Sequence, residues 1–393
     1  MKLRHYVWAA FALATLPAMA EEKDGYKFNT VVQQKTTPVK DQAISGTCWC
    51  FATTSFIESE LLRQGKGEYD LSEMFIVRQK YLNQMADNFL RHGKGNVGQG
   101  SITTSWMTAF NQVGIVPEEV YTGINYDSPV HNHSELAGYV EALSAEAVKQ
   151  SKNSPQYQQL ANSLFDIYFG KLPEKFTYKG KEYTPESFAE SLDIDTDDYI
   201  PLTSFTHKPY YKAFEVEIPD NWEHQRMYNL PLDELISTMN TALENGYTLC
   251  WDGDVSEPGF SFNNGVAINP DVENADLYKD SDRARWGQLS TKDRLAEVFH
   301  FKRPYPEVNV TPEIRQQGYE SGKTTDDHLM HITGIATDQN GTRYYITKNS
   351  WAADGNRFGG YLNMSESYVR AKTIYILVHK DALSQELKKK LGL

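Results

Sequence analysis

The sequence predicts an α+β protein, because helical patterns dominate before residue 245 and strand patterns dominate after it. Apolar residues recur at helical spacing in 49–61 and 74–85, and two further helices are expected at 134–151 and 154–169. Two of the later strand-like runs are separated by Asn340-Gly341, which is typical of a β-hairpin. The 393 residues suffice for two or three cooperating subdomains.

Charge and composition exclude several classes of function. The formal net charge is −13 and no long Lys- or Arg-rich run is present, which argues against nucleic acid as the main partner. Beyond the N-terminus, no apolar run approaches the roughly 18 residues of a membrane span. No spacing of Cys and His residues resembles a zinc site, and we expect no metal and no cofactor.

The first 20 residues have the pattern of a secretory signal peptide. A basic start precedes the apolar stretch Tyr6–Leu16, and Ala18-Met19-Ala20 forms a small-x-small cleavage site before Glu21. The alternative is an ordinary N-terminal helix. The signal predicts an exported protein, expected in a bacterial periplasm.

The stretch from Gln42 to Arg63 indicates a loop that runs into a buried helix. Ser45 and Thr47 are candidate helix caps, so Cys48 falls in or beside the first turn. Unpaired amide donors and the helix dipole favour a thiolate there, and the thiolate is the nucleophilic form. Gln42 lies six residues upstream, where its amide and the Cys48 N–H are candidates to hold an oxyanion.

A hairpin near the C-terminus supplies the partners that such a thiol needs. The strand 327–336, the turn 338–341 and the strand 343–348 would bring His328 to Asn349, at the end of the partner strand. An imidazole that takes the thiol proton, with an amide to hold the ring, activates a Cys nucleophile.

These residues together resemble the papain-type cysteine peptidases. Gln42, five intervening residues and Cys48-Trp49 match the nucleophile motif, and Asn349-Ser350-Trp351 matches the Asn-Ser-Trp motif. The segment Ser45–Trp49 is closer to the bleomycin hydrolase and aminopeptidase C branch than to papain. The resemblance implies a papain-like two-lobe fold, with the nucleophile helix in a helical lobe and His328 in an antiparallel β lobe.

The resemblance also implies the chemistry. Cys48, His328 and Asn349 are the expected catalytic residues, and Gln42 is the expected oxyanion residue. The reaction would start from a Cys48 thiolate paired with a protonated His328. It would hydrolyse a peptide bond through a thioester.

Two neighbouring residues compete for these roles. His331 would point to the opposite face of the strand from His328. Cys50 lies about 200° around the helix from Cys48 and is expected in the core. Because a catalytic Cys48 must stay free, Cys50 and Cys250 are the one pair that a disulfide could join, and both states stay open.

Two loops are candidates to line the cleft. The glycine-rich segment 91–100 is either a surface loop or a backbone wall for substrate. The resemblance implies that Gly98, Gln99 and Gly100 bind the substrate main chain, with Ser101 capping the next helix. The acids Asp252 and Asp254 follow a predicted strand, where they are either turn residues or cleft residues.

The expected organisation has four parts. Residues 1–20 are the signal peptide, and 21–119 form the lead segment and the helical lobe. Residues 120–230 form a mostly helical insertion that papain lacks, and 231–393 form the β lobe with a C-terminal helix.

The favoured activity is an aminopeptidase acting on peptides; the alternatives are an endopeptidase, an acyltransferase and an inactive binding protein. In the related branch, a C-terminal arm lies in the cleft, its carboxylate pairs with the substrate α-amine, and the subunits form a hexameric cage. The segment after Val378 is shorter than that arm, so the arm and the hexamer stay open here. If no such arm is present, the insertion 120–230 is the segment expected to narrow the cleft instead.

Overall fold

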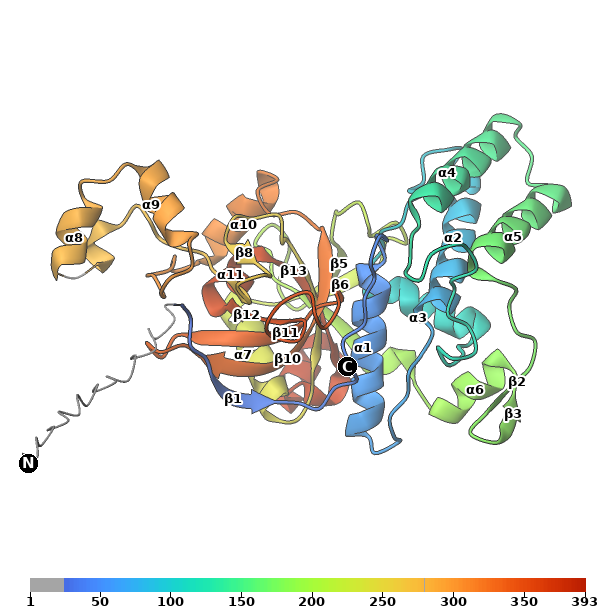
Figure 1. Cartoon of the computed structure of the whole chain (residues 1–393), viewed down its shortest axis with the longest axis horizontal. Helices are drawn as coiled ribbons and strands as arrows, with labels where there is room; N and C mark the ends of the chain where they lie inside the picture. The colour runs from blue at the N-terminus through green and yellow to red at the C-terminus, as the bar shows by residue number, and fades with distance from the viewer. Residues whose placement is uncertain (1–24, 279) are drawn as a thin grey trace, which may run out of the picture.

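The computed structural model describes residues 25–278 and 280–393, so the predicted signal peptide lies outside the described residues. Helix α1 (Cys48–Arg63) stands between a sheet on one side and a group of helices on the other (Figure 1). This arrangement confirms the α+β class. No helix of the described part is long and apolar enough to cross a membrane.

Five further helices and one small hairpin of the described residues complete the helical lobe. These elements are α2 (Glu73–Leu90), α3 (Thr103–Val113), α4 (Ser134–Lys149), α5 (Pro155–Phe169), β2 (Phe176–Tyr178), β3 (Lys181–Tyr183) and α6 (Pro185–Leu192).

The second lobe is built on an eleven-stranded sheet of the described residues, in the order β5-β6-β4-β13-β7-β10-β11-β12-β9-β8 with β1 paired to β10. Its strands are β1 (Asn29–Gln33), β4 (Tyr199–Thr203), β5 (Ala213–Glu215), β6 (Arg226–Asn229), β7 (Leu249–Gly253), β8 (Phe260–Ser261), β9 (Val266–Ala267), β10 (His328–Thr337), β11 (Arg343–Lys348), β12 (Tyr361–Ser365) and β13 (Thr373–His379). The helices around it are α7 (Leu232–Glu244), α8 (Asp280–Trp286), α9 (Thr291–Val298), α10 (Pro312–Glu320), α11 (Glu366–Lys372) and α12 (Gln385–Leu391).

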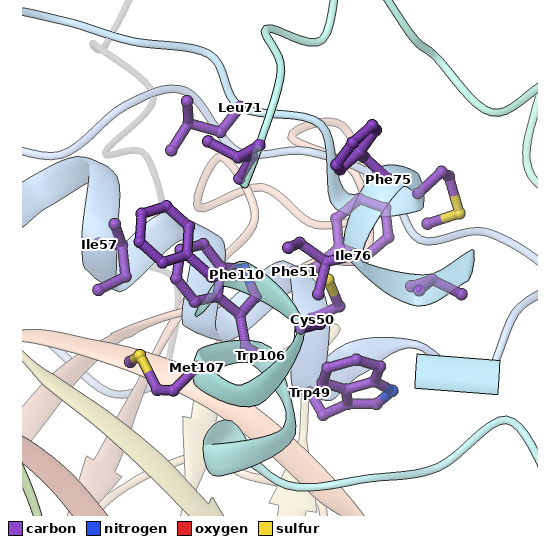
Figure 2. Close-up of a cluster of buried hydrophobic side chains, with 14 of the residues drawn as sticks. Trp49, Cys50, Phe51, Ile57, Leu71, Phe75, Ile76, Trp106, Met107 and Phe110 are labelled. Atoms are coloured by element: carbon purple, nitrogen blue, oxygen red, sulfur yellow. The ribbon is translucent and has the colours of Figure 1, made fainter. Parts of the chain in front are cut away.

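Helix α1 is buried on every side. All residues from Trp49 to Leu61 are buried, and the side chains of Trp49, Cys50 and Phe51 pack among those of α2 and α3 (Figure 2). The buried polar side chains of α1 have partners inside the protein: Glu58 accepts from Thr37 Oγ1 and the Leu71 N–H, and Thr54 accepts from Trp106 Nε1. The first residue of the helix, Cys48, therefore has a position that both lobes determine.

The sheet separates α1 from α7 and α12. Along β10, Leu329 joins the core around α1, whereas Met330 and Ile332 join the core that contains α7 and α12. Strand residues alternate between faces, so α12 lies on the sheet face opposite to α1. Lys390 of α12 pairs with Glu234 of α7 and holds it there.

The main sheet is mostly antiparallel, as predicted; β4–β6 and β12–β9 are its parallel pairs. The structure differs from the predicted organisation in one respect. The segment 120–230 is predicted to be mostly helical, but residues 199–229 contain β4, β5 and β6, which join the main sheet beside β13. Strand β6 reads Arg-Met-Tyr-Asn and has no apolar run, so local pattern does not reveal it.

His133 gives a test of the packing in the helical lobe. Its imidazole is fully buried, has no hydrogen-bond partner in the described structure and packs against Phe169. Burial, aided by the nearby positive charges of His131 and Lys80, lowers its pKa to about 3. The unfolded chain therefore binds a proton first, and the stability that His133 contributes above pH 6.5 is lost as the pH falls toward 3.

We expect wild-type protein to lose about 2–3 kcal/mol of unfolding free energy through His133 between pH 7 and pH 4.5. The variant His133→Leu should lose correspondingly less over this interval, as urea denaturation at both values would measure. The exposed His300, changed to Gln, is the matched control and should leave the pH dependence unaltered. An equal loss in His133→Leu and wild type would contradict the prediction.

Candidate active site

Cys48 is the first residue of α1, as the sequence predicts, but its cap differs from the expected one. Thr47 is the residue before the helix and makes no side-chain cap; its hydroxyl instead bonds to that of Ser45 at 2.6 Å. The Thr47 carbonyl accepts the N–H groups of Cys50 and Phe51. The Cys48 N–H has no intrahelical partner at this position, so an amide donor and the positive helix end meet at the thiol.

His328 and Asn349 are joined as the hairpin predicts. The His328 Nε2 lies 2.8 Å from the Asn349 Oδ1, and both residues are buried. Because the amide oxygen only accepts, Nε2 carries the hydrogen and Nδ1 keeps a lone pair that can take a proton. The Trp351 ring lies with its centroid 4.7 Å from that of His328 and covers the pair.

The thiol lies beside this pair. The backbone N–H of Leu329, the residue after His328, donates to the Cys48 sulfur. A second tie runs deeper in the molecule, where Lys348 Nζ donates to Ser55 of α1 at 2.7 Å and to the Thr37 carbonyl at 2.8 Å. Lys348 directly precedes Asn349, so the strand that carries the amide is bonded to the helix that carries the thiol.

The closed cleft favours uncharged forms of both reacting groups. Burial raises the pKa of Cys48 to about 12, and the negative charges of Asp220 and Asp326 add to the shift. Burial lowers the pKa of His328 to about 4, against the opposing effect of its bond to Asn349. Burial of the two groups opposes the thiolate–imidazolium pair that the sequence predicts, whereas the Leu329 N–H at the sulfur and the Asn349 amide at the imidazole favour it, so the ion pair stays a prediction.

Gln42 is held in one orientation beside the nucleophile loop. Its side-chain oxygen accepts from Ser350 Oγ at 2.6 Å, and its amide nitrogen donates to the Ser45 carbonyl at 2.8 Å. An amide nitrogen has two hydrogens, so one donor remains for another acceptor. Ser350 thus links Gln42 to the His328–Asn349 pair, because its hydroxyl donates to Gln42 and its N–H donates to Asn349 Oδ1.

The glycine-rich loop lies against the nucleophile loop. Gln99 Oε1 accepts from the Gly46 N–H at 2.8 Å, and the Gln99 carbonyl accepts from Trp49 Nε1 at 3.0 Å. The buried Lys80 donates to the carbonyls of Gly98 and Gln99. A Cβ at Gly100 would collide with the Asp220 carboxyl group, so glycine is required there. The expected cap Ser101 is wrong: Ile102 takes that position, and the Ser101 hydroxyl bonds to Ser105 and Trp222.

The structure shows the surroundings of His331 and Cys50 and the state of the three cysteines. His331 Nδ1 bonds to Ser55 within the core, and the Cys50 thiol bonds to the Glu73 carbonyl at 3.3 Å. Cys48, Cys50 and Cys250 are all free, so no disulfide forms.

Asp252, in β7, and Asp254, just after that strand, have different surroundings. Asp254 is bonded to Ser256 and Lys372, which is a structural role. Asp252 is fully buried with no such partner. The sequence did not single out Asp220 or Asp326, although Asp326 stands two residues before His328.

Comparison with known proteins agrees with this geometry. Residues 26–188 match the family described as papain family cysteine protease, and residues 299–392 match the peptidase C1-like family. The two matches identify sequence of papain-like cysteine peptidases in the helical lobe and in the β lobe.

Curated relatives extend over most of the chain. It is 24% identical to Aminopeptidase C of Lactobacillus helveticus, across 89% of this chain and 81% of that one. It is 20% identical to the mitochondrial Cysteine proteinase 1 of Saccharomyces cerevisiae, across 94% and 80%. The crystal structure of PepW from Lactobacillus rhamnosis covers 93% of this chain and 84% of its own at a TM-score of 0.67 and 18% identity, which shows a shared fold. The predicted resemblance to papain-like peptidases of the aminopeptidase C branch is confirmed.

Thiol labelling tests the position of Cys48. Only Cys48 of the three cysteines is partly exposed, whereas Cys50 and Cys250 are fully buried. We expect an epoxide or chloromethyl-ketone thiol reagent to modify native protein once, at Cys48, as peptide mass spectrometry would show. In denaturant all three should react, which serves as the control. Modification of Cys250 in the native protein would contradict the structure.

Proposed function

We propose that this peptidase is an aminopeptidase, which removes residues from the N-terminus of peptides. The observation that carries the proposal is the His328–Asn349 pair at 2.8 Å beside a thiol at a helix N-terminus. Support for the N-terminal specificity comes from relatives named Aminopeptidase C, which match about nine tenths of the chain.

The proposed mechanism begins from the neutral thiol and imidazole, the forms that burial favours. As a peptide carbonyl approaches, the Cys48 proton moves to His328 Nδ1, and the sulfur attacks the carbonyl carbon. The transfer separates charge within the site without changing its net charge, so each new ion is stabilised by the other. The Cys48 N–H and the remaining Gln42 donor face the developing oxyanion.

The second half restores the enzyme. The imidazolium of His328 gives its proton to the leaving amine, and the acyl group stays on the sulfur as a thioester. Water, deprotonated by the now neutral imidazole, hydrolyses the thioester and releases the N-terminal amino acid. Asn349 keeps the ring oriented through both proton transfers.

The cleft of this chain is bounded by the segment after β5 rather than by α12. Helix α12 packs on α7, on the sheet face opposite to α1, so it supplies no carboxylate to the cleft. Residues 219–223 instead lie against the glycine-rich loop: Asn96 donates to the Pro219 carbonyl, and Trp222 donates to Ser101. These two bonds support the proposal that this part of the predicted insertion narrows the cleft.

We also propose that the enzyme is exported to a periplasm through its signal peptide. The support is the sequence pattern of residues 1–20. N-terminal sequencing of protein recovered from the periplasmic fraction should begin at Glu21. Recovery of a chain beginning at residue 1 or 2 from the cytoplasm would contradict export.

Gln42→Ala tests the oxyanion role. We expect turnover to fall by about 10²–10³, the usual cost of one oxyanion donor. Stoichiometric labelling of Cys48 should persist, because the thiol and His328 stay in place. Steady-state kinetics and inhibitor titration measure the two quantities. Unchanged turnover would show that Gln42 has only a structural role, through its hydrogen bonds with Ser45 and Ser350.

Substrate blocking tests the aminopeptidase activity. We expect aminoacyl coumarin amides with a free α-amine to be cleaved faster than their N-acetylated counterparts, and Cys48→Ala to cleave neither. His328→Ala should be nearly as inactive, because members of such a unit do not act additively. Faster cleavage of the acetylated series would replace the aminopeptidase with an endopeptidase.

A further inference from the structure

Two carboxyl groups with covered oxygens and few protein donors, those of Asp252 and Asp326, lie beside the catalytic thiol. Asp252 on β7 pairs in register with Leu329 of β10 and with Tyr375 of β13. Residues directly opposite each other in a sheet share a face. Leu329 packs in the core around α1, and the Tyr375 hydroxyl bonds to Thr103 at the start of α3. Asp252 therefore points toward the helical lobe, at the strand position next to the Leu329 N–H that contacts Cys48.

Asp326 lies against Asp252, with the two carboxyl groups in hydrogen-bond contact. Within the described residues, no donor outside the pair meets the Asp252 oxygens, and the backbone N–H of Asp220 is the donor that faces the Asp326 carboxyl group. Asp252 is fully buried and Asp326 is partly exposed at its backbone and Cβ side, while its oxygens are covered. Unpaired buried carboxylates are costly, and native structures normally satisfy them.

The surroundings add negative charge rather than remove it. Asp220 lies near both acids, and each of the two is destabilised by its charge. The nearest buried cation, Lys80, is committed to the carbonyls of Gly98 and Gln99. Asp327 follows Asp326 in the chain, but its oxygens are occupied by the Val255 N–H and the Thr325 hydroxyl. Burial and mutual repulsion raise the pKa of both Asp252 and Asp326, so the empty pair shares a proton.

A metal ion does not account for the pair. Across the described ranges, no group of three His, Cys, Asp or Glu side chains is arranged to hold one. The missing partner must instead bring several N–H donors and a positive charge into a small space. An ammonium group has three donors and one charge, which suits two adjacent carboxyl groups.

We propose that Asp252 and Asp326 form the binding site for the α-ammonium group of the substrate. This inference rests on the proposed aminopeptidase activity and supplies its structural cause. The α-nitrogen is separated from the scissile carbonyl carbon by one atom only. A site that holds the nitrogen beside the Cys48 sulfur therefore places the first peptide bond, and no later bond, at the nucleophile.

The two acids have different parts in this site. Asp326 is the more exposed and lies on the segment that leads into His328, so it meets the ammonium first. Asp252 lies behind it on the rigid sheet and holds the second carboxyl group. On binding, the shared proton leaves to solvent, and the ammonium replaces it between the carboxylates. The pair is thus a positioning and specificity site, since neither acid takes part in bond cleavage.

The test compares Asp326→Asn and Asp252→Asn with Asp327→Asn as the matched control. The control removes the same charge one residue away from Asp326, where both oxygens have protein donors. For free-amine coumarin amides, we expect KM to rise about 10- to 100-fold in the first two variants, the range expected for one charged hydrogen-bond partner. The kcat should change less than KM, and the control should stay within about threefold of wild type.

Direct binding gives a readout apart from catalysis. In a Cys48→Ala background, calorimetric titration with a dipeptide amide should detect binding that N-acetylation or Asp326→Asn abolishes. The Asn variants should melt at the same temperature as wild type or higher, because each removes a buried acid that has few donors. A lower melting temperature would assign the pair a structural role and overturn the proposal.

The remaining outcomes separate this inference from the proposed function. If wild type prefers free-amine substrates and both Asn variants keep that preference, the α-ammonium site proposed at Asp252 and Asp326 is wrong. The proposed aminopeptidase activity is then still supported. If wild type prefers acetylated substrates, both fail. If the Asn variants selectively lose acetylated peptides with Lys or Arg before the cleaved residue, the pair binds a basic side chain, and the α-ammonium assignment is overturned.

Discussion

The active site depends on one constraint: a helix buried on all sides must end at the boundary between two lobes. Helix α1 is buried from Trp49 to Leu61 between the two lobes, and its first residue meets the strand that starts at His328. The Leu329 N–H and the Lys348 ammonium then hold helix and sheet in register. Neither lobe alone contains a nucleophile and a base, so the site exists only when both are folded and docked.

The same packing limits the contact of the Cys48 thiol and the His328 imidazole with water, and this shifts the pKa of both groups. Burial raises the pKa of the thiol and lowers that of the imidazole, so it favours the neutral form of each group. The charges of Asp220 and Asp326 near the sulfur also oppose a thiolate. A cation that neutralises those acids would ease thiolate formation, so binding and activation would be coupled at this site.

The nucleophile, the base and the amide were predictable from sequence because each depends on local pattern. Small residues before an apolar helix place Cys48, and a two-strand hairpin with Asn340-Gly341 at its turn brings His328 to Asn349. The Asp252–Asp326 contact was not predictable, since it depends on how β7 pairs with β10, a long-range property.

Other differences also have long-range causes. Strand β6, Arg226–Asn229, is short and has no apolar run, and β4 and β5 pair with its two sides. Ser101 has the composition of a cap, but its hydroxyl is bonded to Ser105 and Trp222 instead. In both cases a partner distant in sequence overrides a local preference.

The pairing of β4 with β13 makes the segment 199–229 part of the central sheet rather than an attachment to it. Strand β13 is apolar along its length and buried, with β7 on one side and β4 on the other. Excision of 199–229 would leave the backbone amides of β13 unpaired along an apolar edge, which is a template for association with other chains. If this segment were exchanged for that of a relative, the new segment would need a strand equivalent to β4 to pair with β13.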